Sequence, residues 1–231
     1  MRIKAVLLCK KKSQRLRNKN IRKFANFNFG LLELKIKQLL KVKLINEIII
    51  STDDEKIHKR FHKYHKKLKL FKREKKLCSF KTRTEELIKH ITDLIPNDKI
   101  LWTQVSSPLV DEKIYSKAIK YYKRGIRKGF DSLMSVTPIK QFFWSKSGPL
   151  NYKITKRNKW PRTQDLDEIY HINSAIFIFD KNIYKKRKDR VGKKPIFFSL
   201  KDENSIDIDN YFNFKLGEIL YKSKRTNEKN I

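Results

Sequence analysis

Cysteine is scarce in this sequence: only Cys9 and Cys78 occur among 231 residues. The first lies in an apolar run and the second in a polar segment, so they are too few and too differently placed for a disulfide framework or a zinc site. We therefore expect a reducing compartment, the cytoplasm. Long apolar runs are also missing, and Leu8 stands where signal-peptide cleavage requires a small residue, so we expect neither a signal peptide nor a membrane span.

Acidic residues are few, 24 against 57 lysines and arginines, which gives a formal net charge of +33. Such a charge ordinarily indicates binding to nucleic acid or to an anionic membrane surface. The lysines are spread from end to end, however, and the composition also favours Ile, Asn, Phe and Tyr, as AT-rich coding produces. Part of the charge is therefore background, and we expect only non-specific binding of nucleic acid. A basic nucleic-acid-binding protein remains an alternative.

Short apolar runs alternate with segments of helical periodicity along most of the chain. The runs are rich in Val, Ile and Leu, which is typical of strands buried on both faces of a parallel sheet. The sequence therefore predicts an α/β fold with a doubly wound, mainly parallel sheet, in a single domain over residues 1–225. Strands are expected at residues 3–9, 45–51, 68–71, 100–103, 131–136, 172–179 and 196–200, and helices at 31–42, 54–64, 84–94, 111–123 and 209–221.

The pattern breaks between residues 138 and 170. This stretch contains Trp144, Trp160 and several prolines, and it follows neither the helical nor the strand period. We expect it to leave the sheet as a lid or a dimerisation arm. The chain is polar from Lys222 onward, and residues 226–231 are expected to form a frayed tail.

A cation-rich loop, residues 10–20, follows the first predicted strand. It contains six lysines and arginines, with Ser13 and Asn20 among them. In open α/β sheets the ligand lies off the carboxyl ends of the strands, so this loop is placed to bind one. Cations neutralise phosphate charge, while hydroxyl, amide and backbone N–H groups orient phosphate oxygens. The loop therefore suits a polyphosphate; the alternative is a solvated surface turn in a lysine-rich protein.

Two carboxylates, Asp207 and Asp209, stand out against this positive charge near the end of the chain. At alternate positions of an extended segment they point to the same side. Mg²⁺ usually takes one or two carboxylates together with substrate phosphates, so the pair suits Mg²⁺ shared with the polyphosphate. The alternative is that Asp209 only caps the last helix and Asp207 is an exposed neighbour.

Further polar residues follow other predicted strands or, for Asn173 and Ser174, lie within one, and each has a purely structural alternative. The segment from Gln104 to Pro108 could be an ordinary turn, Asn173 could be a buried amide satisfied by backbone groups, and Arg162 could stack on Trp160. These residues share the carboxyl edge of the sheet with the cation-rich loop, which favours one common site. They are Arg73, Gln104, Ser106, Ser107, Arg162, Asn173 and Ser174.

Six short motifs in order resemble the acylneuraminate cytidylyltransferases, also called CMP-sialic acid synthetases. The resemblance spans the chain from residue 3 to about 220. The motifs are Ser13-x-Arg15-Leu16-x-x-Lys19-Asn20, Ile50-Ser51-Thr52-Asp53, Gln104-x-Ser106-Ser107-Pro108-Leu109, Arg162-x-Gln164, Asn173-Ser174-Ala175-Ile176 and Asp207-Ile208-Asp209.

The resemblance implies a nucleotidyltransferase that transfers CMP from CTP to an acidic sugar, sialic acid or a relative, with Mg²⁺ and release of pyrophosphate. It also implies a homodimer in which residues 138–170 supply part of the partner's site. Catalytic roles fall on Lys19 and Asp209, and metal binding on Asp207 and Asp209. Nucleotide-binding positions are Lys10, Ser13, Arg15, Lys19, Asn20, Arg73 and Thr84, and sugar-binding positions are Gln104, Ser106, Arg162, Gln164 and Asn173.

The sequence departs from the family pattern at several of these motifs. Lys10 replaces an arginine, which removes a bidentate phosphate contact. Ser174 replaces a glycine beside the expected sugar position. Gln14, Val110 and Asn213 replace a lysine, an arginine and an acidic residue. A degenerate member that binds nucleotide without catalysis is therefore a further alternative. The sequence shows no convincing general base, since only His171 of five histidines lies near the expected site.

Overall fold

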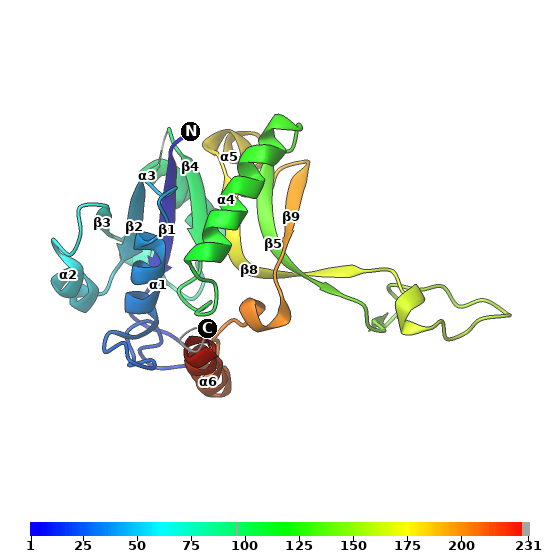
Figure 1. Ribbon diagram of the computed structural model, residues 1–231. Helices are drawn as coiled ribbons and strands as arrows, with labels where there is room; N and C mark the ends of the chain where they lie inside the picture. Colours follow the sequence, from blue (N-terminus) through cyan, green and yellow to red (C-terminus); the bar gives the residue numbers. More distant parts are fainter. Residues whose placement is uncertain (96, 228–231) are drawn as a thin grey trace.

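The computed structural model describes residues 1–95 and 97–227, and its centre is a seven-stranded sheet with helices on both faces (Figure 1). The strand order is β3-β2-β1-β4-β8-β5-β9. The strands are β1 (Ile3–Cys9), β2 (Glu47–Thr52), β3 (Leu68–Lys72), β4 (Lys99–Thr103), β5 (Ser132–Ile139), β6 (Trp144–Ser145), β7 (Gly148–Pro149), β8 (Ile169–Phe179) and β9 (Pro195–Ser199). The helices are α1 (Gly30–Leu40), α2 (Glu55–Phe61), α3 (Thr84–Leu94), α4 (Glu112–Arg127), α5 (Lys181–Arg187) and α6 (Tyr211–Asn227), with short 3-10 turns at Lys75–Cys78, Thr163–Asp165 and Asp202–Ser205.

Strand β1 is buried on both faces, as its unbroken apolar sequence predicts. Ile3, Ala5 and Leu7 face the core formed with α1, α2 and α4, whereas Val6 faces the core formed with α3 and α5. β1 runs parallel to β2 and to β4, and β2 runs parallel to β3. The prediction of a doubly wound, mainly parallel α/β sheet is therefore confirmed.

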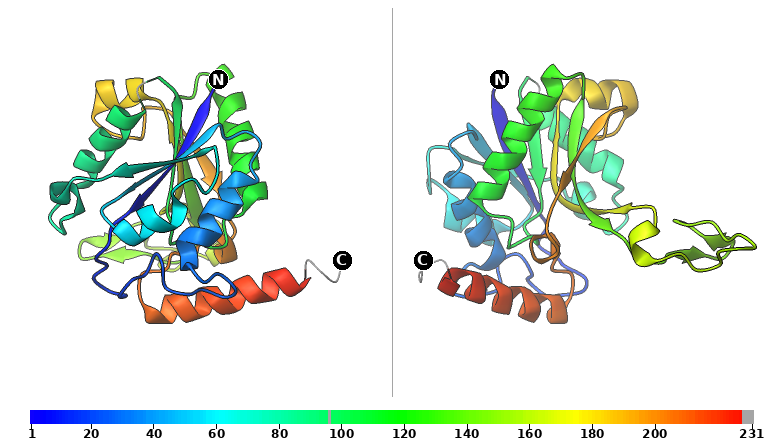
Figure 2. Two further views of the ribbon diagram at one scale, coloured as in Figure 1. Left: turned by 90° about the vertical axis from the view of Figure 1, so that its left-hand side faces the viewer. Right: turned by 45° about the vertical axis from the view of Figure 1, so that its right-hand side comes forward.

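Strand β8 is the exception, because it runs antiparallel to both of its neighbours, β4 and β5. Its pairing with β5 shifts register between Met134 and Val136, and Ser174 within this bulge has a φ of +58°. Beyond the sheet edge β5 and β8 remain paired as far as Ile139 and Ile169. The chain between them, residues 140–168, projects far from the sheet (Figures 1 and 2); we call it the projecting segment.

The closing helix was predicted too short. α6 continues to Asn227 instead of ending at 221, so residues 226 and 227 are helical and the prediction of a tail from 226 is wrong for them. The last turns are anchored because the Tyr221 ring packs on Phe24 and Phe27 and the Lys224 ammonium pairs with Asp111. Residues 228–231 of the predicted tail lie outside the described residues.

Helix α5 was not predicted, and β8 begins three residues earlier than the expected 172. α5 has only seven residues and starts at Asp180, whose carboxylate accepts hydrogen bonds from the backbone N–H groups of Asn182 and Ile183. None of the helices described is long and apolar enough to cross a membrane. α6 and the chain that follows the cation-rich loop lie side by side at one end of the sheet (Figure 2), where the Ala25 N–H donates to Glu218.

Candidate active site

A cleft opens at the carboxyl edge of the sheet, where the cation-rich loop faces the segment after β4 and the segment before α6. Its volume is about 180 Å³. Ser13 and Asp209 both line it, although they lie at opposite ends of the chain. The lining residues are Leu8, Lys10, Ser13, Gln14, Arg15, Leu16, Lys19, Asn20, Gln104, Val105, Ser106 and Asp209.

The cation-rich loop is held in shape by its own polar groups. The Asn20 amide donates a hydrogen bond to the Lys10 carbonyl at 3.2 Å, which closes the loop across its base. The Lys11 N–H donates to Asp53 at 2.8 Å, so the loop is also tied to the end of β2. Asn18 adopts a φ of +56°, a conformation that asparagine tolerates better than most residues. The loop therefore presents its cations from a folded turn.

Two cations of the loop contact the segment from Asp207 to Asp209, which we call the acidic segment. Arg15 Nη2 lies 2.8 Å from Asp209 Oδ1, and Lys19 Nζ lies 3.5 Å from the same oxygen. Lys19 Nζ also donates to the Ile208 carbonyl at 2.8 Å. The basic and acidic halves of the cleft are thus in direct contact, as the sequence predicted for a shared site.

Ile208 orients the two carboxylates beside it. Its side chain is fully buried, and its backbone N–H donates to the Ser106 carbonyl at 2.8 Å. With Ile208 facing the core, Asp207 and Asp209 both face away from it. Asp207 retains contact with solvent, but crowding by protein atoms raises the pKa of its carboxyl and the adjacent Asp209 charge adds to this, against a hydrogen bond from Ser106. The pair is therefore arranged to gain from a cation.

The capping alternative for Asp209 is not what the structure shows. The first turn of α6 is capped by Asn210, whose side-chain oxygen accepts a hydrogen bond from the Asn213 N–H at 2.8 Å. Asp209 is left free of a capping role and directed to the cleft. Among the described residues no group of three or more His, Cys, Asp or Glu side chains could hold a metal. Two carboxylates beside a cation-rich loop nevertheless fit Mg²⁺, whose coordination substrate phosphates usually complete.

The remaining predicted nucleotide-binding residues lie at different distances from the cleft lining. Arg73 is buried at the end of β3 and donates from Nε to the Cys78 sulfur at 3.1 Å. Burial, and then the charge of Arg73, lower the pKa of Lys10, which lines the cleft, whereas Arg73 is not among the lining residues. Thr84 is exposed at the first position of α3 and is not among the lining residues.

The predicted sugar-binding residues fall into three groups. Gln104 and Ser106 line the cleft. Asn173 is buried, and its amide accepts from Ser135 and donates to Thr137, so it matches the description of a satisfied core amide. Arg162 and Gln164 are exposed on the projecting segment, where Arg162 forms two hydrogen bonds to Asp165 at 2.8 and 3.2 Å. The structure does not bring these last two to the cleft of their own chain.

Sequence reasoning missed two polar residues near this edge, Lys35 and Gln38. Both lie on α1 among buried apolar residues and donate to backbone carbonyls of the turn after Ser106. Their positions in the helix could have revealed them, because the spacing of the apolar residues of α1 puts this lysine and this glutamine on its buried face.

A cation-rich loop and a carboxylate pair at the carboxyl edge of a doubly wound sheet define a nucleotide-handling α/β protein. Solved structures share this fold. CMP:2-keto-3-deoxy-manno-octonic acid synthetase, solved with CTP, superposes with a TM-score of 0.68 at 10% identity and covers 97% of this chain and 100% of its own. 4-Diphosphocytidyl-2C-methyl-D-erythritol synthase from Anaerococcus prevotii gives 0.65 at 16% identity, with 96% of each chain covered.

The family model described as Cytidylyltransferase matches residues 5–227, so the chain belongs to the cytidylyltransferase family. Post-translational flagellin modification protein B of Campylobacter coli is 26% identical, over 95% of this chain and 94% of its own length. N-acylneuraminate cytidylyltransferase of Escherichia coli O18:K1:H7 is also 26% identical, over 96% of this chain and 53% of its own. Pseudaminic acid cytidylyltransferase of Campylobacter jejuni is 24% identical, over 91% and 92%. The predicted family relationship and enzyme class are confirmed.

Proposed function

We propose that this cytidylyltransferase transfers CMP from CTP to an acidic sugar, sialic acid or a related α-keto acid sugar, and releases pyrophosphate. The observation that carries the proposal is the closure of one cleft by the cation-rich loop and Asp209. The names of the relatives, acylneuraminate and pseudaminic acid cytidylyltransferases, support an acidic sugar as acceptor. The product would serve surface-glycan synthesis, and we place the reaction in the cytoplasm.

The cleft residues can carry this reaction by positioning and charge. The sugar hydroxyl attacks the α-phosphorus of CTP and loses its proton to solvent, the bond from the α-phosphorus to the bridging oxygen of the β-phosphate breaks, and pyrophosphate leaves with the electron pair. We assign Ser13 and Asn20 to orienting phosphate oxygens, and Lys10, Arg15 and Lys19 to stabilising the charge that develops on the leaving group. Lys19 lies close enough to Asp209 to face the same phosphates.

Asp207 and Asp209 would hold Mg²⁺ beside the phosphates. When bound, the ion supplies positive charge to the reacting phosphate group and the leaving pyrophosphate. Arg15 and Lys19 contact Asp209 Oδ1, and the phosphates of CTP would compete with this carboxylate for the two cations. The carboxylates would then be left to the metal.

Gln104 and Ser106 are assigned to the sugar because they line the cleft opposite the cation-rich loop. We assign Arg162 and Gln164 to the cleft of a partner subunit in a homodimer, reached by the projecting segment. The course of the projecting segment, which carries both residues away from the sheet, supports this assignment (Figure 1). So does the exposure of apolar rings beside them: Trp144 is 57% exposed and Trp160 66%. Isolated exposed rings are ordinary, but a cluster of them on a projection suits a protein contact.

The test is a pyrophosphate-release assay with CTP, Mg²⁺ and a panel of sialic, pseudaminic and legionaminic acids. Turnover with one of these sugars is expected, and its dependence on added Mg²⁺ tests the metal assignment. CTP binding without turnover on any sugar would favour a degenerate member, while failure to bind CTP would contradict the proposal. Sedimentation equilibrium tests the dimer. Nucleic acid binding that disappears between low and physiological salt would identify that activity as background charge.

A further inference from the structure

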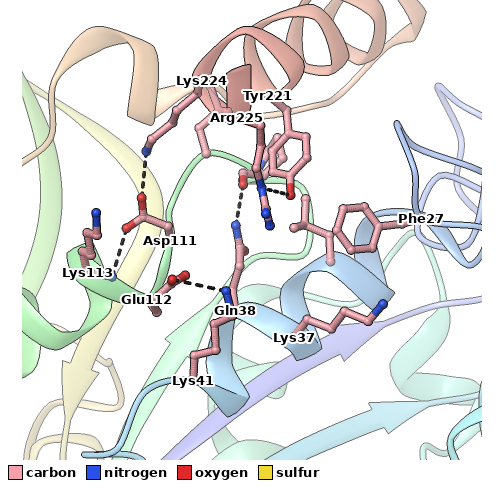
Figure 3. A pocket seen from close by; sticks show the side chains of 13 residues that line it. Phe27, Lys37, Gln38, Lys41, Asp111, Glu112, Lys113, Tyr221, Lys224 and Arg225 are labelled. Carbon is pink, nitrogen blue, oxygen red and sulfur yellow. Dashed lines mark hydrogen bonds and ion pairs between the residues drawn. The ribbon is translucent and has the colours of Figure 1, made fainter. Parts of the chain in front are cut away.

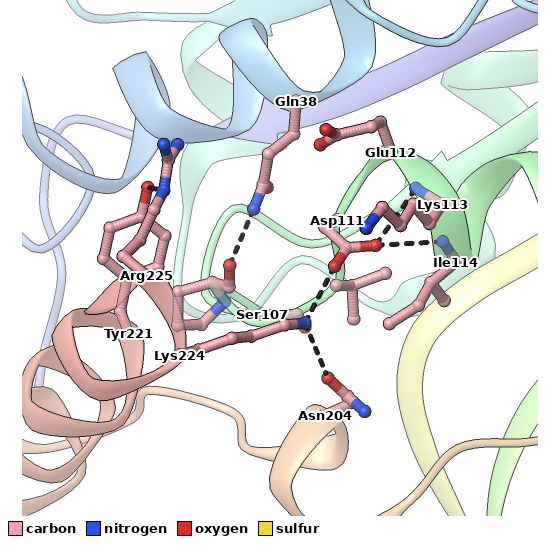
Figure 4. Close-up of polar contacts among 12 residues, drawn as sticks. Gln38, Ser107, Asp111, Glu112, Lys113, Ile114, Asn204, Tyr221, Lys224 and Arg225 are labelled. Carbon is pink, nitrogen blue, oxygen red and sulfur yellow. Dashed lines mark hydrogen bonds and ion pairs between the residues drawn. The ribbon is translucent and has the colours of Figure 1, made fainter. Parts of the chain in front are cut away.

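The turn from Ser107 to Asp111 connects the cleft to α4, and we call it the post-Ser106 turn. It begins directly after Ser106, which lines the cleft, and it ends at Asp111, which caps α4 through hydrogen bonds from the backbone N–H groups of Lys113 and Ile114. Its peptide groups are mostly buried, so their carbonyls need partners inside the protein. Figure 4 shows that side chains reach the turn from two helices.

Helix α1 supplies the partners on one side. Lys35 Nζ donates to the Ser107 carbonyl at 2.8 Å and to the Val110 carbonyl at 2.9 Å. Gln38 Nε2 donates to the Pro108 carbonyl at 2.8 Å (Figures 3 and 4). Two side chains of one helix thus bind three carbonyls of the turn.

Lys35 is fully buried, and burial lowers the pKa of its ammonium well below the usual value, against the charge of Asp111. Its ammonium lies 5.0 Å from the centre of the Tyr115 ring. Burying a lysine costs free energy that an apolar residue of the same length would not cost. The two hydrogen bonds to carbonyl oxygens offset part of that cost. They fix where the turn lies relative to α1.

Helix α6 supplies the partner on the other side. Lys224 Nζ lies 2.7 Å from Asp111 Oδ2 and 3.5 Å from Asn204 Oδ1. Figure 4 shows Gln38 and Lys224 reaching the turn from opposite helices. The turn is therefore fixed at both of its ends.

The fixed turn continues into the acidic half of the cleft. Ser107 N–H donates to the Gln104 carbonyl at 3.5 Å, and Ile208 N–H donates to the Ser106 carbonyl at 2.8 Å. A displacement of the turn would move Ser106 and, through Ile208, both Asp207 and Asp209. We propose that Lys35 and Gln38 are positioning residues that hold Ser106 and the carboxylate pair in their working places through the post-Ser106 turn. This inference rests on the proposed function.

The test replaces each donor by an apolar residue of similar length, Lys35→Met and Gln38→Leu, in the full chain. Two matched controls accompany them. Lys37→Met removes an exposed lysine from the same helix, where it pairs with Glu33, and Ile91→Ala destabilises the core on the opposite face of the sheet. All five proteins are assayed at a temperature at which thermal unfolding shows each to be folded. If Lys35→Met does not fold, Gln38→Leu carries the test with Lys35 still in place.

For a positioning role we expect kcat to fall by about 10²-fold in Lys35→Met and by about tenfold in Gln38→Leu, since misplacement of a reacting group by about 1 Å has effects of this size. The KM for CTP should change little, because the cation-rich loop is untouched. Amide exchange over residues 104–111 and 206–209 should accelerate in the same two variants. Neither control should show these effects.

The inference is overturned if the two variants lose stability as Ile91→Ala does but keep the kcat of the unchanged protein and its amide exchange at residues 206–209. Failure of the proposed function appears separately, as absence of pyrophosphate release from the unchanged protein. In that event the exchange rates alone decide, because they report whether the turn holds the acidic segment in place without any turnover.

Discussion

Asp209 Oδ1 accepts a hydrogen bond from Arg15 Nη2 at 2.8 Å and forms an ion pair with it, although the two residues are 194 positions apart in the sequence. The arginine belongs to the loop that follows the first strand, and the aspartate directly precedes the cap of the last helix. Both side chains are partly exposed, so the pair itself contributes little to stability. Its significance is the geometry, since it places the cation-rich loop and a carboxylate on one cleft.

Replacing Asp209 by Asn is expected to lower kcat by at least about 10²-fold, because the metal-binding charge is removed while shape is retained. The free energy of unfolding should change by less than about 1 kcal/mol, since its ion pair is exposed. The measurement is steady-state pyrophosphate release together with urea unfolding. Asp202→Asn, in the exposed turn just before the acidic segment, is the control and should retain full activity.

The Lys19→Met variant is expected to lose about 10²–10³-fold in kcat, because a charge aimed at the leaving group is removed. Lys12→Met is its matched control: Lys12 belongs to the same loop but is exposed and does not line the cleft. Both changes remove one positive charge, so a loss of equal size in the two variants would mean that only the general potential of the loop matters. Initial rates of both variants, measured at saturating and at limiting CTP, distinguish a specific role of Lys19 from an effect of the loop's total charge.

Ser174 occupies a left-handed conformation, with a φ of +58°, that favours glycine. Ser174→Gly is therefore expected to raise the free energy of unfolding by about 1 kcal/mol. Ser199→Gly, in strand β9, is the control and should lower it by about 0.5–1 kcal/mol. Urea unfolding measures both. An unchanged or lowered stability in Ser174→Gly would contradict the inferred backbone strain.

The Asp111–Lys224 pair predicts a dependence of stability on pH. Burial alone would raise the pKa of Asp111, but the Lys224 ammonium and the N–H groups of α4 outweigh it and lower the pKa. A carboxyl whose pKa is lowered in the folded state stabilises the fold at pH values above its ordinary pKa. This contribution to stability is lost as the pH falls below about 4. The difference in unfolding free energy between the unchanged protein and Asp111→Asn should be about 1 kcal/mol at pH 7 and shrink toward zero in acid. A difference independent of pH would exclude this cause.

The fold could be predicted from the sequence where strands are buried on both faces, because such strands consist almost entirely of apolar residues. The apolar runs at Ile3–Cys9 and Glu47–Thr52 could only be central strands, because both of their faces are covered. The direction of β8 was not readable, since an apolar run is the same in either orientation. The end of α6 was missed because its last turns are polar in sequence and are held by contacts with residues far away, at Phe24 and Asp111.

The site was readable where residues follow strand ends. Ser13, Gln104 and Asp209 meet because the carboxyl edge of a parallel sheet collects the loops that carry them. Asn173 is also a polar residue in an apolar surrounding, but its side-chain amide forms hydrogen bonds to Ser135 and Thr137 inside the core. Lys35 went unnoticed because lysine is ordinarily a surface residue, and only coordinates reveal the two carbonyls it serves.

The order of the chain has a consequence for biosynthesis. Every strand of the sheet precedes Asp207 and Asp209, so a growing polypeptide acquires its cationic loop first and its acidic counterpart last. Until translation reaches the final helix, Arg15 and Lys19 have no Asp209 to contact. Nucleotide binding at an intermediate stage of synthesis would lack both carboxylates, so activity requires that translation has passed Asp209.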